Sequence, residues 1–230
     1  AHARARILSD FPNWQVQTRV LEGSPARELL RQADVWRPDL IVVGSQGRSA
    51  LGRLLLGSVS KVLATSALCS VRVGRRGAVR DEGAPVRLVV GVDGSPGARW
   101  AVRALGVRAW PEGTEVRLVV VDDGRGPARA ADGRPRLEDL LTGRNEGVPV
   151  NARLMAEGAR VVLAEAGLRA SVEIREGDPR RVLSEEALAW AADAIFVGSN
   201  GLDHLDEKSG LGTVSEALVT GAACSVEVVR

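Results

Sequence analysis

The chain has 230 residues, of which 45% are hydrophobic and 26% charged, a composition typical of a globular protein. Its 31 basic and 29 acidic side chains leave a net charge of +2, which gives no support for a nucleic-acid partner. No apolar run approaches the roughly 20 residues of a membrane helix, and the first residues lack the apolar core of a secretory signal. We therefore expect a cytoplasmic protein without a membrane partner.

The first 74 residues predict an incomplete α/β unit. In chain order they indicate a short helical segment, then a strand at 14–22, a helix at 26–36, a strand at 39–44, a helix at 58–67 and a strand at 70–74. A doubly wound unit would begin with two more strands and a helix, and those strands would lie at or near the centre of its sheet. We therefore expect exposed strand edges here and further residues upstream of Ala1. A rearranged or swapped first unit is the alternative.

Residues 86–230 predict a complete unit. Buried strands are expected at 87–93, 116–122, 171–177, 193–199 and 225–229, because each is a short apolar run next to a turn. Helices are expected at 95–105, 151–166, 180–191 and 214–220, and a polar, Gly-rich loop at 123–149. Alternating strands and helices predict a doubly wound parallel five-stranded sheet, flavodoxin-like or Rossmann-like, with strand order 3-2-1-4-5.

The two units are copies of one another. DLIVVGSQG in the first matches DAIFVGSNG in the second, and ALCSVRV matches AACSVEV. Gly44 and Gly198 are related by a shift of 154 and Gly57 and Gly212 by a shift of 155, so the second unit has gained one residue in between. We therefore divide the chain into a first unit (1–74), a linker (75–85) and a second, complete unit (86–230).

A pair of glycine turns is the strongest functional signal. Gly44-Ser45-Gln46-Gly47 ends a predicted strand, and after nine residues Gly57-Ser58 opens the next helix. Ligands of doubly wound sheets bind at this edge, where glycine lets the backbone approach an anion. Free N–H groups and the dipole of the helix favour phosphate. The motif therefore indicates a triphosphate cradle, or else two tight turns and a serine helix cap.

This spacing resembles the universal stress protein family, in which ATP-binding members carry Gly, two residues, Gly, nine residues, then Gly and Ser or Thr. The stretch LLLGSVS at 54–60 also resembles the family. The resemblance implies an adenosine-contacting role for Asp93 and adenine packing for Val121. It implies a nucleotide site lined by Val43, Gly44, Gly47, Gly57, Ser58, Val59, Val92, Asp93, Val121, Gly198, Gly201, Gly212, Thr213 and Val214.

Each copy departs from that pattern. The first has no equivalent of Asp93 or Val121, whereas the second has a ten-residue loop that carries three carboxylates. Negative charge beside a phosphate is unfavourable unless a divalent cation intervenes, so the expected cofactor is ATP, alone or with Mg²⁺. Thr213 followed by Glu216 also predicts a capping box, in which Thr213 caps its own helix.

The function that these patterns favour is the binding of ATP or a related adenine nucleotide in a stress response, with at most slow hydrolysis, because no nucleophile–base pair or metal site stands out. A scaffold of the same fold that does not bind nucleotide, an adenine-nucleotide hydrolase and a regulatory segment of a larger transporter or kinase are the alternatives. The resemblance also implies an intramolecular pseudo-dimer through strands 70–74 and 225–229, and a homodimer of chains.

Several single residues are interpreted as structural. Cys69 and Cys224 lie in apolar segments and are expected to be inert. His204 is read as an exposed loop residue, because no second histidine is near. The five tryptophans are read mostly as packing residues and not as a stacking platform for nucleic acid.

Overall fold

The computed structural model of the chain describes residues 2–46, 56–75, 83–124, 150–201 and 210–230. The second unit forms as the sequence predicts, with small shifts at element ends. Its elements in chain order are β3 (Arg87–Gly91), α4 (Pro96–Gly106), β4 (Glu115–Asp122), α6 (Val150–Glu165), β5 (Arg169–Glu176), α7 (Pro179–Ala189), β6 (Ala194–Gly198), α8 (Thr213–Gly221) and β7 (Ser225–Val229).

The strands of the second unit have the order β7-β6-β3-β4-β5, and all of these neighbours are parallel. Numbered within the unit, this is the predicted order 3-2-1-4-5, read from the opposite edge. The fold is therefore a doubly wound α/β sheet, and the carboxyl ends of β3 and β6 lie beside each other at its centre.

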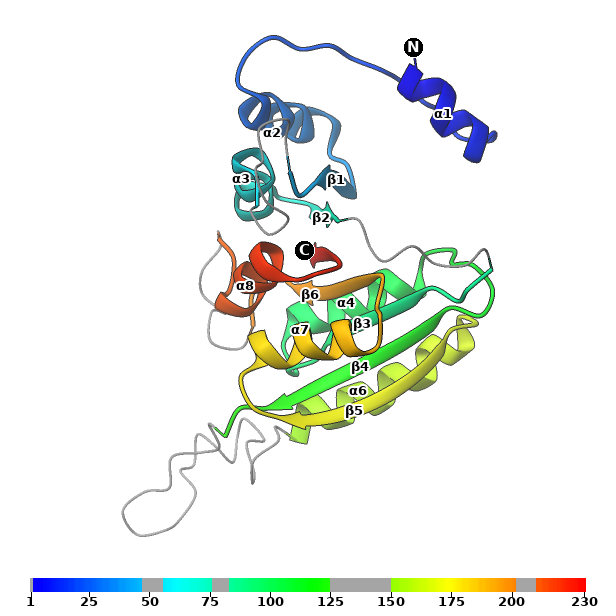
Figure 1. Cartoon of the computed structure of the whole chain (residues 1–230), viewed down its shortest axis with the longest axis vertical. Helices are drawn as coiled ribbons and strands as arrows, with labels where there is room; N and C mark the ends of the chain where they lie inside the picture. Colours follow the sequence, from blue (N-terminus) through cyan, green and yellow to red (C-terminus); the bar gives the residue numbers. More distant parts are fainter. Residues whose placement is uncertain (1, 47–55, 76–82, 125–149, 202–209) are drawn as a thin grey trace.

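The first unit supplies α2 (Pro25–Trp36), β1 (Leu40–Gly44), α3 (Ser58–Ser66) and β2 (Ser70–Gly74), preceded by α1 (His2–Asp10). α1 buries no residue and stands apart at the end of an extended segment (Figure 1). β1 pairs with β2 in parallel, and β1 forms one end of the sheet.

The predicted strand at 14–22 was wrong. These residues are extended but unpaired, and Val20 is 96% exposed. Alternating apolar residues give a segment the tendency to form a strand, but a strand also needs a neighbour for its backbone groups. In the unit order 3-2-1-4-5 the third strand pairs with the second, and the described part of the first unit contains no second strand.

The two units share one sheet. β2 pairs with β7 in antiparallel fashion, which joins the described strands into a seven-stranded sheet in the order β1-β2-β7-β6-β3-β4-β5. This is the edge-to-edge pairing of final strands that the sequence analysis expects. Figure 1 shows the first unit stacked on the second through this contact.

Helices cover both faces of the sheet. On one face α3, α7 and α8 pack in a single apolar cluster that includes Leu63 of the first unit and Leu218 of the second. On the other face α4 and α6 cover a cluster centred on Leu105, Leu163 and Phe196. Because the first cluster crosses the boundary between the units, burial of apolar surface stabilises the pairing as well as each unit.

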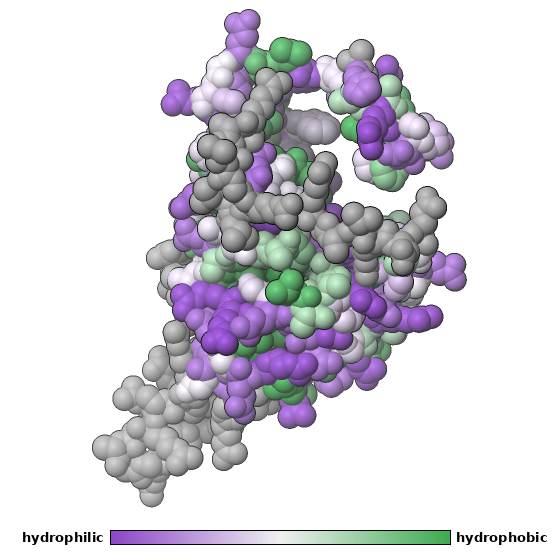
Figure 2. Space-filling view, in the orientation of Figure 1, coloured by the Kyte–Doolittle hydropathy of each residue, from purple (hydrophilic) through white to green (hydrophobic). Residues whose placement is uncertain are grey.

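α7 is amphipathic. It buries Leu183 and Ala187, whereas Figure 2 shows a mostly hydrophilic surface over this helix.

The tryptophans follow the packing prediction only in part. Trp110 and Trp190 are partly buried against the two clusters, but Trp14 and Trp36 are 60% and 81% exposed.

Candidate nucleotide site at the glycine turns

The glycine turn after β6 is held tightly against the start of α4. A Cβ atom on Gly198 would lie 2.6 Å from the backbone of Gly97, and one on Gly97 would lie 2.7 Å from the carbonyl oxygen of Asn200. Real side chains do not make such contacts with backbone, so both positions require glycine. The close approach brings the carboxyl end of β6 and the first turn of α4 together at the predicted ligand edge.

The same hydrogen bonds shape the turn in both units. Gly57 N donates to Ser45 O and Gly212 N donates to Ser199 O, each at 2.8 Å. One turn into the next helix, Ser60 Oγ donates to Gly44 O at 2.7 Å, and Ser215 Oγ donates to Gly198 O at 2.6 Å.

Each of these contacts ties a glycine turn to the helix that follows it. The two phosphate-binding candidates therefore have the same local structure, although the sequences between their glycines differ in length.

Helix α3 begins at Ser58 as predicted, and α8 begins at Thr213, one residue earlier than predicted. Gly57 and Gly212 occupy the N-cap positions, and neither helix has a side-chain cap hydrogen bond. The predicted capping box was therefore wrong, as was a serine cap at Ser58. Thr213 is the first helical residue, and Glu216 instead forms an ion pair with Lys61 of α3.

The start of α8 is left without a side-chain cap. Among the described residues no side-chain cap hydrogen bond is found there, so no side chain accepts from the N–H groups of the first turn of this helix. This is the arrangement in which a helix N-terminus favours an anion.

Asp93 lies beside the glycine turn of the second unit. Its Oδ1 accepts a hydrogen bond from Ser95 N at 2.9 Å, and its Oδ2 lies 2.8 Å from where a Cβ of Gly201 would be. Ser95 in turn caps α4 by accepting from Ala98 N at 3.1 Å. The turn between them is completed by Gly94, whose φ of 85° suits glycine. The structure thus brings Asp93, Gly198 and Gly201 together, as the sequence predicts.

The remaining predicted residues differ in their accessibility. Val92 is only 3% exposed and packs in the cluster under α4 and α6, so its side chain belongs to the core. The side chains of four others are partly buried against the other cluster, namely Val43, Val59, Val121 and Val214. Gly47 and most of the acidic loop, 202–209, lie outside the described residues. His204 also falls there.

Gly97 and Ser215 are two residues of the site that the sequence analysis missed. Gly97 follows a serine and a proline at a helix start, where a glycine has no conformational purpose, and this oddity was the available signal. Ser215 has its counterpart Ser60 three residues after the equivalent glycine, so comparing the two copies position by position would have found both serines.

The electrostatics near the end of each unit agrees with the expectation that the cysteines are unreactive. Burial raises the pKa of the Cys224 thiol to about 11, and burial also raises the pKa of Cys69. Thiols with raised pKa values are poor nucleophiles at neutral pH. Among the described residues, no group of three or more His, Cys, Asp or Glu side chains could hold a metal ion, and no helix has the length and apolar character to cross a membrane.

The fold and the paired glycine turns define a tandem of doubly wound α/β units with helix N-termini at the ligand edge. The profile of the universal stress protein family matches residues 3–75 and 86–230, and the chain belongs to this family. A universal stress protein of Mycobacterium bovis is 31% identical over 208 residues, which cover 84% of this chain and 62% of that protein. One of Mycolicibacterium smegmatis is 30% identical, covering 98% and 72% respectively.

Solved structures agree on the fold. A universal stress protein from Archaeoglobus fulgidus has a TM-score of 0.59 at 20% identity, covering 100% of this chain and 75% of its own. A putative universal stress protein from Pseudomonas aeruginosa has a TM-score of 0.60 at 16% identity, covering 99% and 77%. At sequence identities this low, the similarity supports the fold and says nothing about a ligand.

Proposed function

We propose that the glycine turns bind ATP or a related adenine nucleotide, and that the protein uses this binding in a cytoplasmic stress response without strong catalysis. The observation that carries the proposal is the start of α8, where an uncapped helix N-terminus meets a glycine turn held beside Asp93. The N–H groups of the first turn suit the phosphates, and a carboxylate suits the hydroxyl groups of a ribose.

The first unit supports binding of phosphate alone. It has the same turn and the same uncapped helix, α3, but its described residues include no counterpart of Asp93 or of β4. We therefore propose that the second unit provides the more complete site, and that Mg²⁺ accompanies the nucleotide where carboxylates lie near the phosphates. A homodimer of chains is part of the same proposal.

Calorimetric titration with ATP, in the presence and absence of Mg²⁺, tests the proposal. Ser58→Glu and Thr213→Glu each put a carboxylate at the first position of α3 or α8, where it competes with phosphate. Both side chains are exposed and an acidic residue suits a helix N-terminus, so the fold should be retained. We expect Thr213→Glu to weaken binding at least tenfold and Ser58→Glu to remove only the weaker site.

Matched controls place the same charge at the other end of the same helices. Ser66→Glu in α3 and Thr220→Glu in α8 change the net charge equally but stand away from the glycine turns, so they should leave the affinity within about twofold. Absence of heat and of a thermal shift at millimolar nucleotide would reject the proposal and favour a scaffold that does not bind nucleotide.

A further inference from the structure

The pairing of β2 with β7 has an approximate two-fold axis that the repeat reveals. Arg72 and Glu227 are equivalent residues of the two units, 155 positions apart, and they face each other in the register of the strands. On either side, Val71 faces Val228 and Val73 faces Val226. The axis therefore passes between Arg72 and Glu227. In a pair of identical units, each of these residues would face its own copy.

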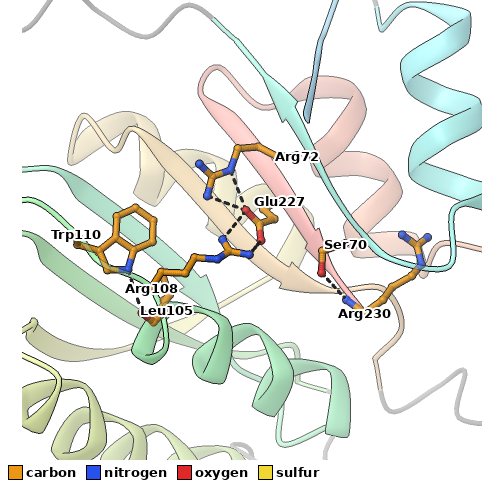
Figure 3. A network of polar contacts seen from close by, with 7 residues as sticks. All are labelled: Ser70, Arg72, Leu105, Arg108, Trp110, Glu227 and Arg230. Carbon is orange, nitrogen blue, oxygen red and sulfur yellow. Dashed lines mark hydrogen bonds and ion pairs between the residues drawn. The ribbon is translucent and has the colours of Figure 1, made fainter. Parts of the chain in front are cut away.

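Glu227 is the most tightly enclosed charge in this contact. It is 0% exposed, and its Oε2 accepts from Arg72 Nε at 2.8 Å across the axis. Arg108, which follows α4 in the same unit as Glu227, donates to Oε1 at 2.6 Å and to Oε2 at 2.9 Å. Figure 3 shows both guanidinium groups converging on the carboxylate. Both also lie over the ring of Phe196, at 5.3 and 5.9 Å from its centre.

A second pair of equivalent residues meets across the axis. Lys61 of α3 and Glu216 of α8 are also 155 positions apart, and Lys61 Nζ lies 3.3 Å from Glu216 Oε1. The pair is exposed, so it contributes less than the buried one. Both self-facing positions nevertheless carry a cation in the first unit and an anion in the second.

The rest of the contact is the same in both directions. Arg75 Nη2 donates to Val219 O and Thr220 O at the end of α8, at 2.6 and 3.0 Å. Its counterpart Arg230 donates to Ala64 O near the end of α3 at 2.5 Å and to Cys69 O just before β2 at 3.3 Å.

Equivalent serines also accept equivalent hydrogen bonds in the two units. Arg75 N donates to Ser225 Oγ and Arg230 N donates to Ser70 Oγ, each at 3.2 Å. Because these contacts use equivalent arginines and serines and otherwise only backbone carbonyl groups, they would serve two identical units equally well. The two self-facing pairs are the positions on the axis at which the units differ in charge.

We propose that Arg72 and Lys61 make the final-strand edge of the first unit selective for an acidic partner edge, that of the second unit, and prevent it from pairing with another first unit. Two first units would bring Arg72 against Arg72, and the described residues of the first unit supply no carboxylate at this position, so the pairing is unfavourable.

The selectivity is unequal in the two units. Two second units would face Glu227 against Glu227, but each would bring its own Arg108, which compensates the charge. The barrier to self-pairing therefore lies mainly in the first unit, and the second unit is the more permissive edge.

Substitutions in the full chain can imitate both kinds of identical pair. Glu216→Lys with Glu227→Arg in the Arg108→Gln background reproduces the facing charges of two first units. Lys61→Glu with Arg72→Glu, with Arg108 kept, reproduces the facing charges of two second units that share one arginine. Hydrogen exchange of amides in β2, residues 70–74, reports whether the strands pair, and β4, residues 115–122, reports whether the second unit is folded. We expect the first imitation to lose roughly 100-fold of protection in β2 and the second imitation to lose less.

A charge cycle at the central pair separates charge from loss of packing. With Arg108→Gln as the common background, Arg72→Glu and Glu227→Arg are made singly and together. Each single variant should lose protection in β2, and the double variant should recover most of it because the pair is opposite again.

Three results would overturn the proposal. The first is a first-unit imitation whose protection in β2 stays within about threefold of that in the parent chain. The second is a double variant whose β2 amides are as unprotected as those of the single variants. The third is a loss of protection in β4 equal to that in β2. The last result would mean that the charges support the fold of the second unit and not the choice of partner.

Discussion

Glycines at the predicted ligand edge have a packing role besides the role in anion binding that we propose for them. The sequence predicts that Gly198 frees the backbone for a phosphate, and the structure shows that the backbone of Gly97 also leaves no room for a Cβ at this position. The pattern of glycines located the turn correctly. It could not reveal the contact, because Gly97 lies 101 positions earlier in the chain and no local signal links the two.

Gly198→Ala should therefore destabilise the fold even without a ligand. Its Cβ would lie 2.6 Å from the backbone of Gly97, and the two elements would have to separate at a cost of about 1–3 kcal/mol. Chemical denaturation measures this loss. Gly158→Ala, in α6 where a Cβ meets nothing within 4 Å, is the control and should gain about 0.5–1 kcal/mol. Equal effects at the two positions would contradict the packing role.

The thiol of Cys224 should react slowly and should link stability to pH. Burial raises its pKa from 9.0 to about 11, so at pH 8 only about 0.1% is thiolate. Alkylation followed by mass spectrometry should be at least tenfold slower in the folded than in the unfolded chain. The raised pKa stabilises the folded state below pH 9, and this contribution is lost as the pH rises toward about 11. Cys224→Ala should flatten that part of the pH profile.

Helix starts show how far local rules reach at the scale of elements. Asp178 and Ser95 each precede a proline, and their side chains cap α7 and α4 as is typical of polar residues in that position. Ser24, in the same pattern before α2, makes no side-chain cap bond. At α8 the capping-box pattern failed, because the chain enters that helix through Gly212 and the turn fixes its N–H to Ser199 O. At α8 a tertiary contact therefore determined how the helix begins.

Ser95→Ala should loosen the start of α4 next to the candidate site. The hydroxyl accepts from Ala98 N, and its loss leaves a buried donor without a partner, so we expect a cost of about 1 kcal/mol in the free energy of unfolding. Urea titration measures it. The control is Ser184→Ala on α7, whose hydroxyl bonds only within its own helix and whose loss should change stability by less than about 0.5 kcal/mol. A cost at Ser184 as large as that at Ser95 would argue against the cap.

The failed strand at 14–22 shows the limit of periodicity for whole elements. Residues 40–44 and 70–74 have short apolar patterns and form strands because each finds the other as a neighbour. Residues 14–22 have a comparable pattern and no neighbour among the described residues. Composition and alternation predict which segments can join a sheet, and the partner available in three dimensions determines which ones do.

At the scale of the molecule, the sequence predicted the architecture well. The alternation of strands and helices predicted the doubly wound topology, and the family resemblance implied the pairing of final strands. The details of that pairing needed coordinates, because the arginines that cross it bond to carbonyl groups, which every residue possesses. Arg75 and Arg230 thus resemble ordinary surface cations in the sequence.

Arg230→Ala should weaken the contact between the units. Its guanidinium binds the carbonyl oxygens of Ala64 and Cys69, and the loss of hydrogen bonds from a charged group should cost about 2 kcal/mol. Hydrogen exchange should show faster exchange at the end of α3 before any change in β4. Arg160→Ala, at an exposed position on α6 that forms an ion pair with Glu157, is the control and should have little effect. Unchanged exchange in α3 would contradict this role.

The single antiparallel pair in the sheet also sets the direction from which each unit meets its surroundings. Since β2 and β7 run in opposite directions, the carboxyl ends of the first unit's strands open at one border of the sheet and those of the second unit at the opposite border. One small molecule therefore cannot touch both glycine turns at once. Two ligands would approach from opposite sides without colliding, and a macromolecule docked over one border would leave the other free to exchange its ligand with solvent.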